Sequence, residues 1–209
     1  MMRIDAVASR PDRAGRYTVC FCDGSVMRLY RQTIEDFGIY AGQELSQDEM
    51  TALKTAAGAM SAKMRAVRIV AASNVSKKDL EQRLIHKGED PHQAKQAVRW
   101  MCDMDLVDDR RTAEQIVSRC VSKGYGVARA KQALYEKRIP KEYWEEVLAD
   151  YPDQMGAIED FLRTRLQGSD DPRELRKSID ALLRRGHSYG QIRRGLDRLS
   201  LYTDDLPED

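Results

Sequence analysis

The sequence predicts a mainly α-helical protein, in which three tandem three-helix repeats form an elongated curved array after a small N-terminal unit that contains a β-hairpin. Three observations predict this fold class. Residues 1–60 alternate in the manner of strands, the strand pattern ends near residue 60, and three later segments align with one another at helical spacing. We expect a β-rich unit with a linking helix at 1–60, three-helix repeats at 61–109, 110–154 and 155–203, and an acidic tail at 204–209.

The N-terminal unit is predicted from short alternating segments. In RYTVCF, Tyr17, Val19 and Phe21 fall on one face, and Asp23-Gly24 is typical of a hairpin turn that VMRLY would complete. RIDAVAS is a further strand candidate, and QTIEDFG is expected to make one or two helical turns. Ser46 followed by Glu49 is a capping box, so a helix should lead from this unit into the repeats.

The repeats are predicted from a register that holds across three segments, KDLEQRLIHKGEDPHQAKQAV, ARAKQALYEKRIPKEYWEEVL and LRKSIDALLRRGHSYGQIRRGL. Leu84, Leu134 and Leu182 occupy one position. Two later apolar positions and one basic position stay in step with it: Ala94, Trp144 and Ile192; Val98, Leu148 and Leu196; Lys87, Lys137 and Arg185. The residue after the basic one is Gly88, Arg138 or Gly186, and glycine there suits the left-handed end of a helix.

Each repeat is expected to contain three helices. The first helices are predicted at 63–72, 111–123 and 156–167. Capping residues place the starts of the second helices at Ser76, Gly126 and Asp171-Pro172, and those of the third helices near Asp90-Pro91, Pro140 and Ser188. Because a unit of this size buries little apolar surface by itself, neighbouring repeats should pack on one another.

The segment DLVDDRRTAEQIVSRCVSKGYG, residues 105–126, concentrates carboxylates and arginines where two repeats would join. Asp108 or Asp109 is predicted to cap the following helix, since a carboxylate accepts hydrogen bonds from free N–H groups there. An acid/base site would need partners and a cleft that no other segment supplies. Gly124-Tyr125-Gly126 lacks the spacing of a phosphate-binding loop and is predicted to end a helix.

The composition argues against membrane and metal proteins. No run approaches the ~18 apolar residues that a membrane helix needs, and the first residues lack the apolar stretch of a signal peptide, so we expect a cytoplasmic protein. The four cysteines and three histidines are not spaced as zinc ligands. We therefore expect reduced thiols, no metal and no other cofactor.

The net charge of +1 conceals local excesses of basic residues. Residues 61–149 hold 18 basic and 13 acidic residues, and residues 173–198 hold 8 and 3. Such segments can bind phosphate groups with salt-dependent affinity. Exposed cations on a helix, however, usually do no more than make that face of the helix hydrophilic. The candidate contacts are the recurring cations of the three repeats: Arg83, Lys87, Arg119, Lys123, Arg129, Lys131, Lys137, Arg184, Arg185, Arg193 and Arg194.

Other side chains carry weaker signals. The third helix of the middle repeat carries Glu142, Glu145 and Glu146, so that face should avoid phosphate. Trp100 and Trp144 are expected in the core, beside apolar residues of their helices. Tyr125 and Tyr189 lie at predicted turns, where they would staple the turn or stack on a base.

Several short motifs in and just before the middle repeat resemble those of a known protein family. The run from Asp105 to Ala113, then Arg119 with Lys123-Gly124-Tyr125-Gly126, and then Leu134 with Lys137 resemble the signature of the RecX regulatory proteins. The likeness extends over residues 65–199, and the N-terminal β unit resembles one seen in some members. This resemblance implies tandem three-helix repeats and a non-enzymatic modulator of the RecA recombinase, usually inhibitory, that lies in the groove of the RecA filament on single-stranded DNA.

The chain departs from the pattern of the family at a few positions. Members often have glycine and an aromatic residue at Asp105 and Leu106, an aromatic residue at Thr112, and Lys-Gly-Ile where this chain has Lys137-Arg138-Ile139. These departures bear on local packing and on binding strength.

Three hypotheses follow. The first is a modulator of the RecA filament, which implies RecA as partner, with contacts to single- and double-stranded DNA left open and a monomer as the expected state. The second is a direct nucleic-acid binder built of helix-turn-helix-like repeats, without a RecA target. The third, an enzyme, has no support in the sequence, which contains no assembled nucleophile, base or phosphate loop.

Overall fold

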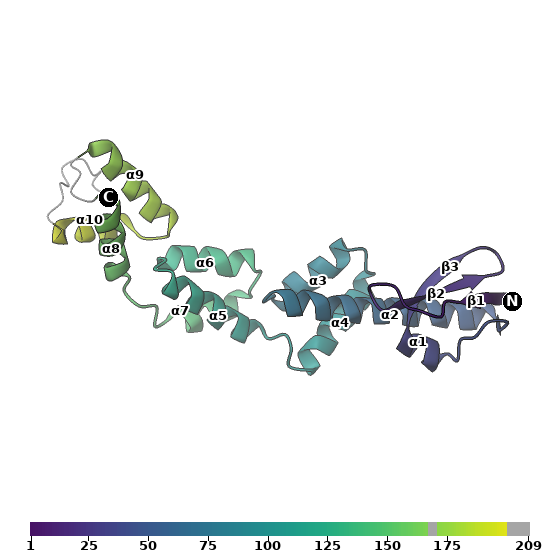
Figure 1. The fold of residues 1–209 in the computed structure, drawn as a ribbon. Helices are drawn as coiled ribbons and strands as arrows, with labels where there is room; N and C mark the ends of the chain where they lie inside the picture. The colour runs from purple at the N-terminus through teal and green to yellow at the C-terminus, as the bar shows by residue number, and fades with distance from the viewer. Residues whose placement is uncertain (167–170, 200–209) are drawn as a thin grey trace. The chain divides into compact units, whose positions relative to one another are not determined.

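The computed structural model describes residues 1–166 and 171–199. The chain divides into two compact units, Met1–Val107 and Asp108–Asp209, whose elements are labelled in Figure 1. The acidic tail expected at 204–209 lies outside the described residues, as does the end of the third repeat at 200–203.

The N-terminal unit begins with an antiparallel sheet of four strands. They are β1 (Met2–Val7), β2 (Arg16–Phe21), β3 (Val26–Tyr30) and β4 (Glu44–Leu45), in the order β3-β2-β1-β4. The hairpin at Asp23-Gly24 is confirmed, because Gly24 has a positive φ of 81° and β2 pairs with β3. Val19 and Phe21 are buried as expected, whereas the two-residue β4 gave no signal in the sequence.

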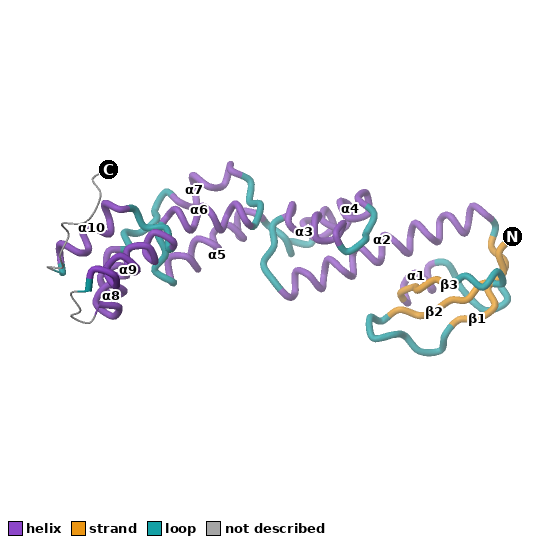
Figure 2. The backbone as a smooth tube through the Cα atoms, turned by 90° about the horizontal axis from the view of Figure 1, so that it is seen from above, coloured by secondary structure: helices purple, strands orange, loops and turns teal. Residues whose placement is uncertain are grey.

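The helix α2 (Gln47–Ala72) is longer than predicted. It follows the short α1 (Arg31–Asp36), starts at the expected capping box of Ser46 and Glu49, and continues through residue 60 without a break (Figure 2). Met50 and Leu53 pack on the sheet, whereas Ala62 and Ala66 pack in the first helical bundle. The two helices expected on either side of residue 60 are therefore one, because burial at both ends outweighs the cost of Gly58, about 1 kcal/mol.

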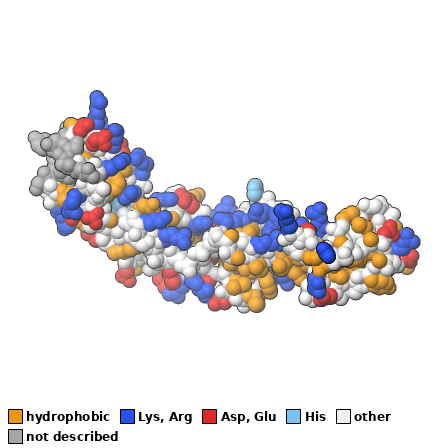
Figure 3. All heavy atoms as spheres, in the orientation of Figure 1, with side chains coloured by type: hydrophobic (Ala, Val, Ile, Leu, Met, Phe, Trp, Pro, Cys, Tyr) orange, Lys and Arg blue, Asp and Glu red, His pale blue; other side chains and the backbone are white. Residues whose placement is uncertain are grey.

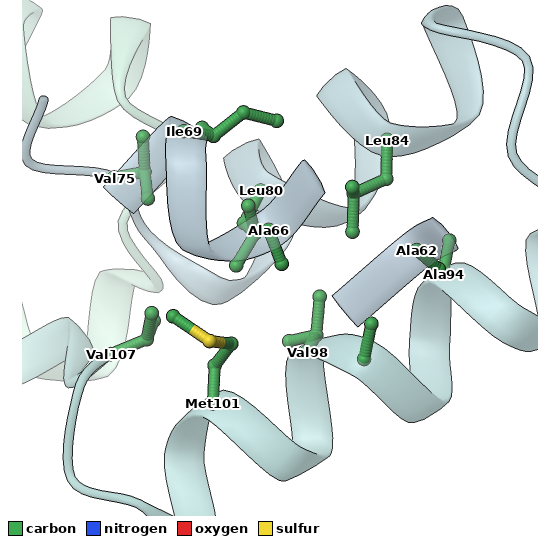
Figure 4. Packing of buried hydrophobic residues seen from close by; sticks show 11 residues of the cluster. Ala62, Ala66, Ile69, Val75, Leu80, Leu84, Ala94, Val98, Met101 and Val107 are labelled. Carbon is green, nitrogen blue, oxygen red and sulfur yellow. The ribbon is translucent and has the colours of Figure 1, made fainter. Parts of the chain in front are cut away.

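Two further helices complete the first bundle. They are α3 (Lys77–His86), which starts at the expected cap Ser76, and α4 (Pro91–Asp103), which starts at Asp90 with proline in the first turn. Figure 4 shows their side chains and those of α2 turned toward a common interior. Leu80, Leu84 and Met101 are almost fully buried there, so the bundle has its own apolar core.

The second unit holds two more bundles. The middle one consists of α5 (Asp109–Ser122), α6 (Val127–Glu136), the 3-10 turn η1 (Lys141–Tyr143) and α7 (Trp144–Leu148). The last one consists of α8 (Met155–Leu166), α9 (Pro172–Arg184) and α10 (Tyr189–Arg198). The third helix of the middle bundle, predicted to start near Pro140, begins there as the 3-10 turn and is α-helical only from Trp144. Its start has no side-chain cap, and Trp144 is half-buried with its indole N–H donated to the Ile139 carbonyl at 3.1 Å.

The predicted register of the repeats is confirmed by the ends of the second helices. Leu84, Leu134 and Leu182 are fully buried, and each lies two residues before the last residue of its helix. Their carbonyl groups accept hydrogen bonds of 3.0–3.2 Å from the backbone N–H groups of Glu89, Ile139 and His187. The residue before each donor has a positive φ: Gly88, Arg138 and Gly186. The same helix-ending motif therefore occurs three times, and the mainly helical fold with its N-terminal β unit is confirmed.

Candidate interaction surface

Exposed cations lie on the second helices of the first two bundles. Figure 3 shows Lys and Arg side chains gathered over α3 and over α6. On α6 the exposed Lys131 lies between Ala130 and Leu134, which are fully buried. The helix is thus fixed by its apolar face and presents its basic face to solvent.

Three of the predicted contact arginines are instead held within the chain. Arg83 is half-buried and pairs with Asp79 at 3.0 Å. Arg129, which was expected to be exposed, is half-buried and pairs with Glu136 at 3.1 Å. Arg185 lies over the ring of Phe161, 4.3 Å from its centroid. Each of these arginines thus has a contact within its own bundle, and its role in binding stays a prediction.

The Glu136 carboxyl group, which pairs with Arg129 on α6, has a lowered pKa. Hydrogen bonds from Gln132 and then from Arg129 hold the pKa of Glu136 below its usual value. Glu136 therefore stays ionised and paired with Arg129, whereas Lys131 is exposed and forms no ion pair within residues 1–166 and 171–199.

Seven other candidates are exposed, and the structure records no ion pair for them within residues 1–166 and 171–199: Lys87, Arg119, Lys123, Lys131, Arg184, Arg193 and Arg194. Arg119 and Lys123 come together at the end of α5, with Lys123 directly after its last residue. Arg193 and Arg194 are neighbours on α10. Lys137 is half-buried and takes part in other contacts.

Sequence reasoning missed two cations on α4. Lys95 and Arg99 are exposed one helical turn apart, on the same side of the helix. Lys95 could have been predicted from the repeats. The offsets of 50 and 48 residues that align Leu84 with Leu134 and Leu182 also align Lys95 with Glu145 and Arg193. The third helices of the first and last bundles are thus basic where that of the middle bundle is acidic.

Within residues 105–111, Asp108 and Arg110 make contacts inside the middle bundle. Asp108 caps α5 by accepting a hydrogen bond from the Arg111 N–H at 3.1 Å, as expected. Arg110 pairs with Glu114 at 3.3 Å and with Glu146 of α7. The acidic third helix is therefore tied to the first helix of its own bundle.

A close contact joins the middle and last bundles of the second unit. The Gly126 N–H donates to the Arg185 carbonyl at 2.9 Å, and a Cβ at Gly126 would lie 2.0 Å from the Gly186 carbonyl oxygen. His187 is buried, and its Nε2 lies 3.1 Å from the Gly124 carbonyl oxygen. Gly124, with a φ of 65°, ends α5 as expected, but the contact of Gly126 with a residue 60 positions later has no local signal in the sequence.

Burial shifts two pKa values near this junction. Desolvation lowers the pKa of His187, so its neutral form is favoured. Burial also raises the pKa of Tyr151 to about 12, and its hydroxyl donates to the Tyr125 carbonyl at 2.7 Å. Tyr189 is 39% exposed at the start of α10, whereas Tyr125 is half-buried.

Within residues 1–166 and 171–199, no helix has the length and apolar content needed to cross a bilayer. The same residues bring together no three His, Cys, Asp or Glu side chains that would hold a metal ion. All four cysteines are free thiols.

Comparison with known proteins gives concordant matches. Residues 108–148 match a family model described as "RecX, second three-helix domain". The regulatory protein RecX of Halorhodospira halophila is 30% identical over 142 residues, which cover 66% of this chain and 88% of the relative. That of Vibrio campbellii is 28% identical over 145 residues, which cover 66% of this chain and 92% of the relative.

A solved structure has the same fold. The crystal structure of a regulatory protein RecX superimposes with a TM-score of 0.62 at 19% identity, covering 94% of this chain and all of the other. The matches in sequence and fold agree with the three repeats described above. This chain belongs to the RecX family of regulatory proteins.

Proposed function

We propose that this protein is a non-enzymatic regulator of homologous recombination and DNA repair. It binds the RecA filament on single-stranded DNA and inhibits the ATPase and strand-exchange activities of RecA. It acts in the cytoplasm as a monomer. Membership of the RecX family carries this proposal, since the relatives are named regulatory proteins.

The distribution of charge supports binding as the mode of action. Each of the three bundles presents exposed cations that form no ion pair in the described part of the chain, such as Lys87, Lys131 and Arg194. Cations of this kind displace counterions from phosphates, so binding to a nucleoprotein filament should weaken as salt is added. The acidic surface of η1 and α7, with Glu142 and Glu145 exposed, is suited to basic protein surface rather than to DNA.

The test is DNA-stimulated ATP hydrolysis by the cognate RecA, with the protein added at less than one molecule per RecA. We expect suppression of ATP hydrolysis and of strand exchange at these amounts. An unrelated DNA-dependent ATPase on the same DNA is the control. Equal suppression of both enzymes would contradict the proposal and favour a direct nucleic-acid binder that masks DNA.

A further inference from the structure

A small cavity lies at the junction of the middle and last bundles. Its volume is about 320 Å³, and it is bounded by the first residues of α6, by the segment between α7 and α8, and by α10. The lining side chains used below are Val127, Tyr151, Asp153, Gln154 and Arg194. Ligand pockets in proteins start at about 300 Å³, so this one has room for a single compact group.

The walls combine apolar and polar groups. Val127 is 38% exposed, and Tyr151, whose hydroxyl is already held by the Tyr125 carbonyl, also lines the cavity. Asp153 accepts a hydrogen bond from the Met155 N–H at 3.2 Å through Oδ1, which leaves Oδ2 as an acceptor. The Gln154 amide adds a donor and an acceptor. A nucleobase binds apolar side chains with its flat face and hydrogen-bonds to polar groups with its edge, and this cavity offers both kinds of group.

The cavity is also suited to a phosphate. Arg194 lines it, is exposed, and forms no ion pair within residues 1–166 and 171–199. Lys131 lies one turn after Val127 on α6 and therefore on the same side of that helix. The start of α6 has no side-chain cap, which further favours negative charge at this wall. Arg194 and the nearby Lys131 outnumber the one carboxylate of the lining, Asp153, which favours a nucleic acid over an acidic or neutral peptide as the source of the ligand.

We propose that this cavity binds one unstacked nucleotide of a single-stranded nucleic acid, with the base between Val127 and Tyr151 and the phosphate on Arg194. The proposal rests on the proposed function, since that function brings the protein to single-stranded DNA. A base in a duplex is stacked and paired, so it cannot enter. The cavity thus gives the protein a preference for single strands that cations on a surface do not provide.

The experiment uses the full chain and fluorescence anisotropy without RecA. The probes are a dC oligonucleotide of about 12 nucleotides, an abasic strand of equal length, and a duplex. The variants are Val127→Trp, which fills the cavity, Gln154→Ala, which removes a polar group from its wall, and Arg194→Ala. Gln154→Ala still tests the cavity if Val127→Trp misfolds. Arg193→Ala is the matched control, because it removes the same charge from the same turn of α10 without touching the cavity.

We expect Val127→Trp and Arg194→Ala to weaken binding of the dC strand about tenfold. The wild type should bind the abasic strand more weakly than the dC strand by a similar factor. Arg193→Ala should weaken it about threefold at most, and both arginine variants should bind the duplex equally. Wild-type affinity of Val127→Trp, Gln154→Ala and Arg194→Ala for the dC strand, or equal binding of the dC and abasic strands to the wild type, would overturn the proposal. So would loss of RecA inhibition by Arg194→Ala with unchanged binding of the dC strand, because a protein group would then occupy the cavity.

RecA inhibition by the wild-type protein, measured in parallel, separates the two proposals. If the wild type inhibits RecA but Val127→Trp binds the dC strand normally, the cavity is not a nucleotide site and the proposed function stands. If the wild type fails to inhibit RecA, the proposed function is wrong, and the oligonucleotide series still decides the role of the cavity.

Discussion

Two residues, Asp105 and Arg138, hold backbone conformations that L-residues rarely adopt. Their φ angles are 55° and 54°, and Arg138 stands where the other two repeats have Gly88 and Gly186 with φ of 89° and 86°. Aspartate tolerates the left-handed region because its short polar side chain bonds locally, but arginine has no such advantage. The departure of residue 138 from the glycine expected for the family therefore costs stability.

The first prediction tests this cost at Arg138. We expect Arg138→Gly to be more stable than Arg138→Ala by about 1 kcal/mol in urea unfolding. Both variants remove the arginine side chain and its contacts, so their difference isolates the backbone conformation. Equal stability of the two variants would show that the positive φ is not strained.

The second prediction concerns Lys131. Because this side chain is exposed and its neighbours Ala130 and Leu134 carry the packing, Lys131→Glu should leave the unfolding free energy within about 0.5 kcal/mol of wild type. Loss of one phosphate contact should weaken RecA inhibition about threefold to tenfold and reduce the salt slope of DNA binding by about 1. The measurements are ATPase titrations and anisotropy at several salt concentrations.

Arg129→Glu is the contrasting variant. It sets two carboxylates against each other by breaking the pair with Glu136, so helix stability should fall along with inhibition. Unchanged inhibition and an unchanged salt slope in Lys131→Glu would remove Lys131 from the interface.

At the scale of single residues, the buried set was easier to predict than the binding set. Leu84, Leu134 and Leu182 follow from periodicity, because burial of one helix face constrains the sequence at every turn. Cations carry no such constraint. Arg185 stacks on Phe161, which lies 24 positions earlier, and nothing near either residue in the sequence indicates this contact.

At the scale of elements, the junction between α6 and α9 depends on atoms that lie close together. Gly126 approaches Gly186, and the buried His187 lies three residues after Arg184, the last residue of α9. Because the Gly124 carbonyl can only accept, Nε2 carries the proton of the neutral ring. Nδ1 is then buried without a partner among the described residues, so protonation of the ring is opposed.

The third prediction is a pH dependence of stability that arises from His187. Burial lowers its pKa in the folded protein, with Arg185 acting in the same direction, whereas the unfolded chain has the ordinary value of about 6.5. The unfolded state therefore binds more protons below that pH, so stability falls as the pH drops from about 7 to about 5.5. Urea unfolding at the two pH values measures the loss.

His187→Gln is the control for this dependence, because its amide N–H can still donate to the Gly124 carbonyl. The variant should lose less stability than wild type over the same pH interval. Equal losses in the two proteins would mean that other groups cause the dependence.

Helix starts could be predicted more reliably than helix lengths. Ser46, Ser76 and Asp90 cap helices as expected, because capping is a local interaction between a side chain and the first turn. The continuity of α2 and the shortness of α7 depend on packing against other elements. Propensity near Gly58 or Pro140 therefore could not determine where these helices run or stop.

At the scale of the whole chain, the mainly helical class and the N-terminal β unit could be predicted because each unit contains its own apolar core. The cavity at the junction of α6 and α10 could not be predicted, since Val127 and Arg194 are brought together only by packing between bundles. Exposed cations occur on all three bundles, so, under the proposed function, we expect binding to depend on the whole chain rather than on one bundle.

Binding to RecA-coated and bare DNA tests the central claim most directly. Labelled protein is titrated with a single-stranded oligonucleotide, alone or covered by RecA and a non-hydrolysable ATP analogue, at one salt concentration. We predict binding to the RecA filament at least about tenfold tighter than to the bare strand, since the filament adds a protein surface to the phosphates. Loss of binding once RecA covers the strand would contradict a filament target and leave bare DNA as the ligand.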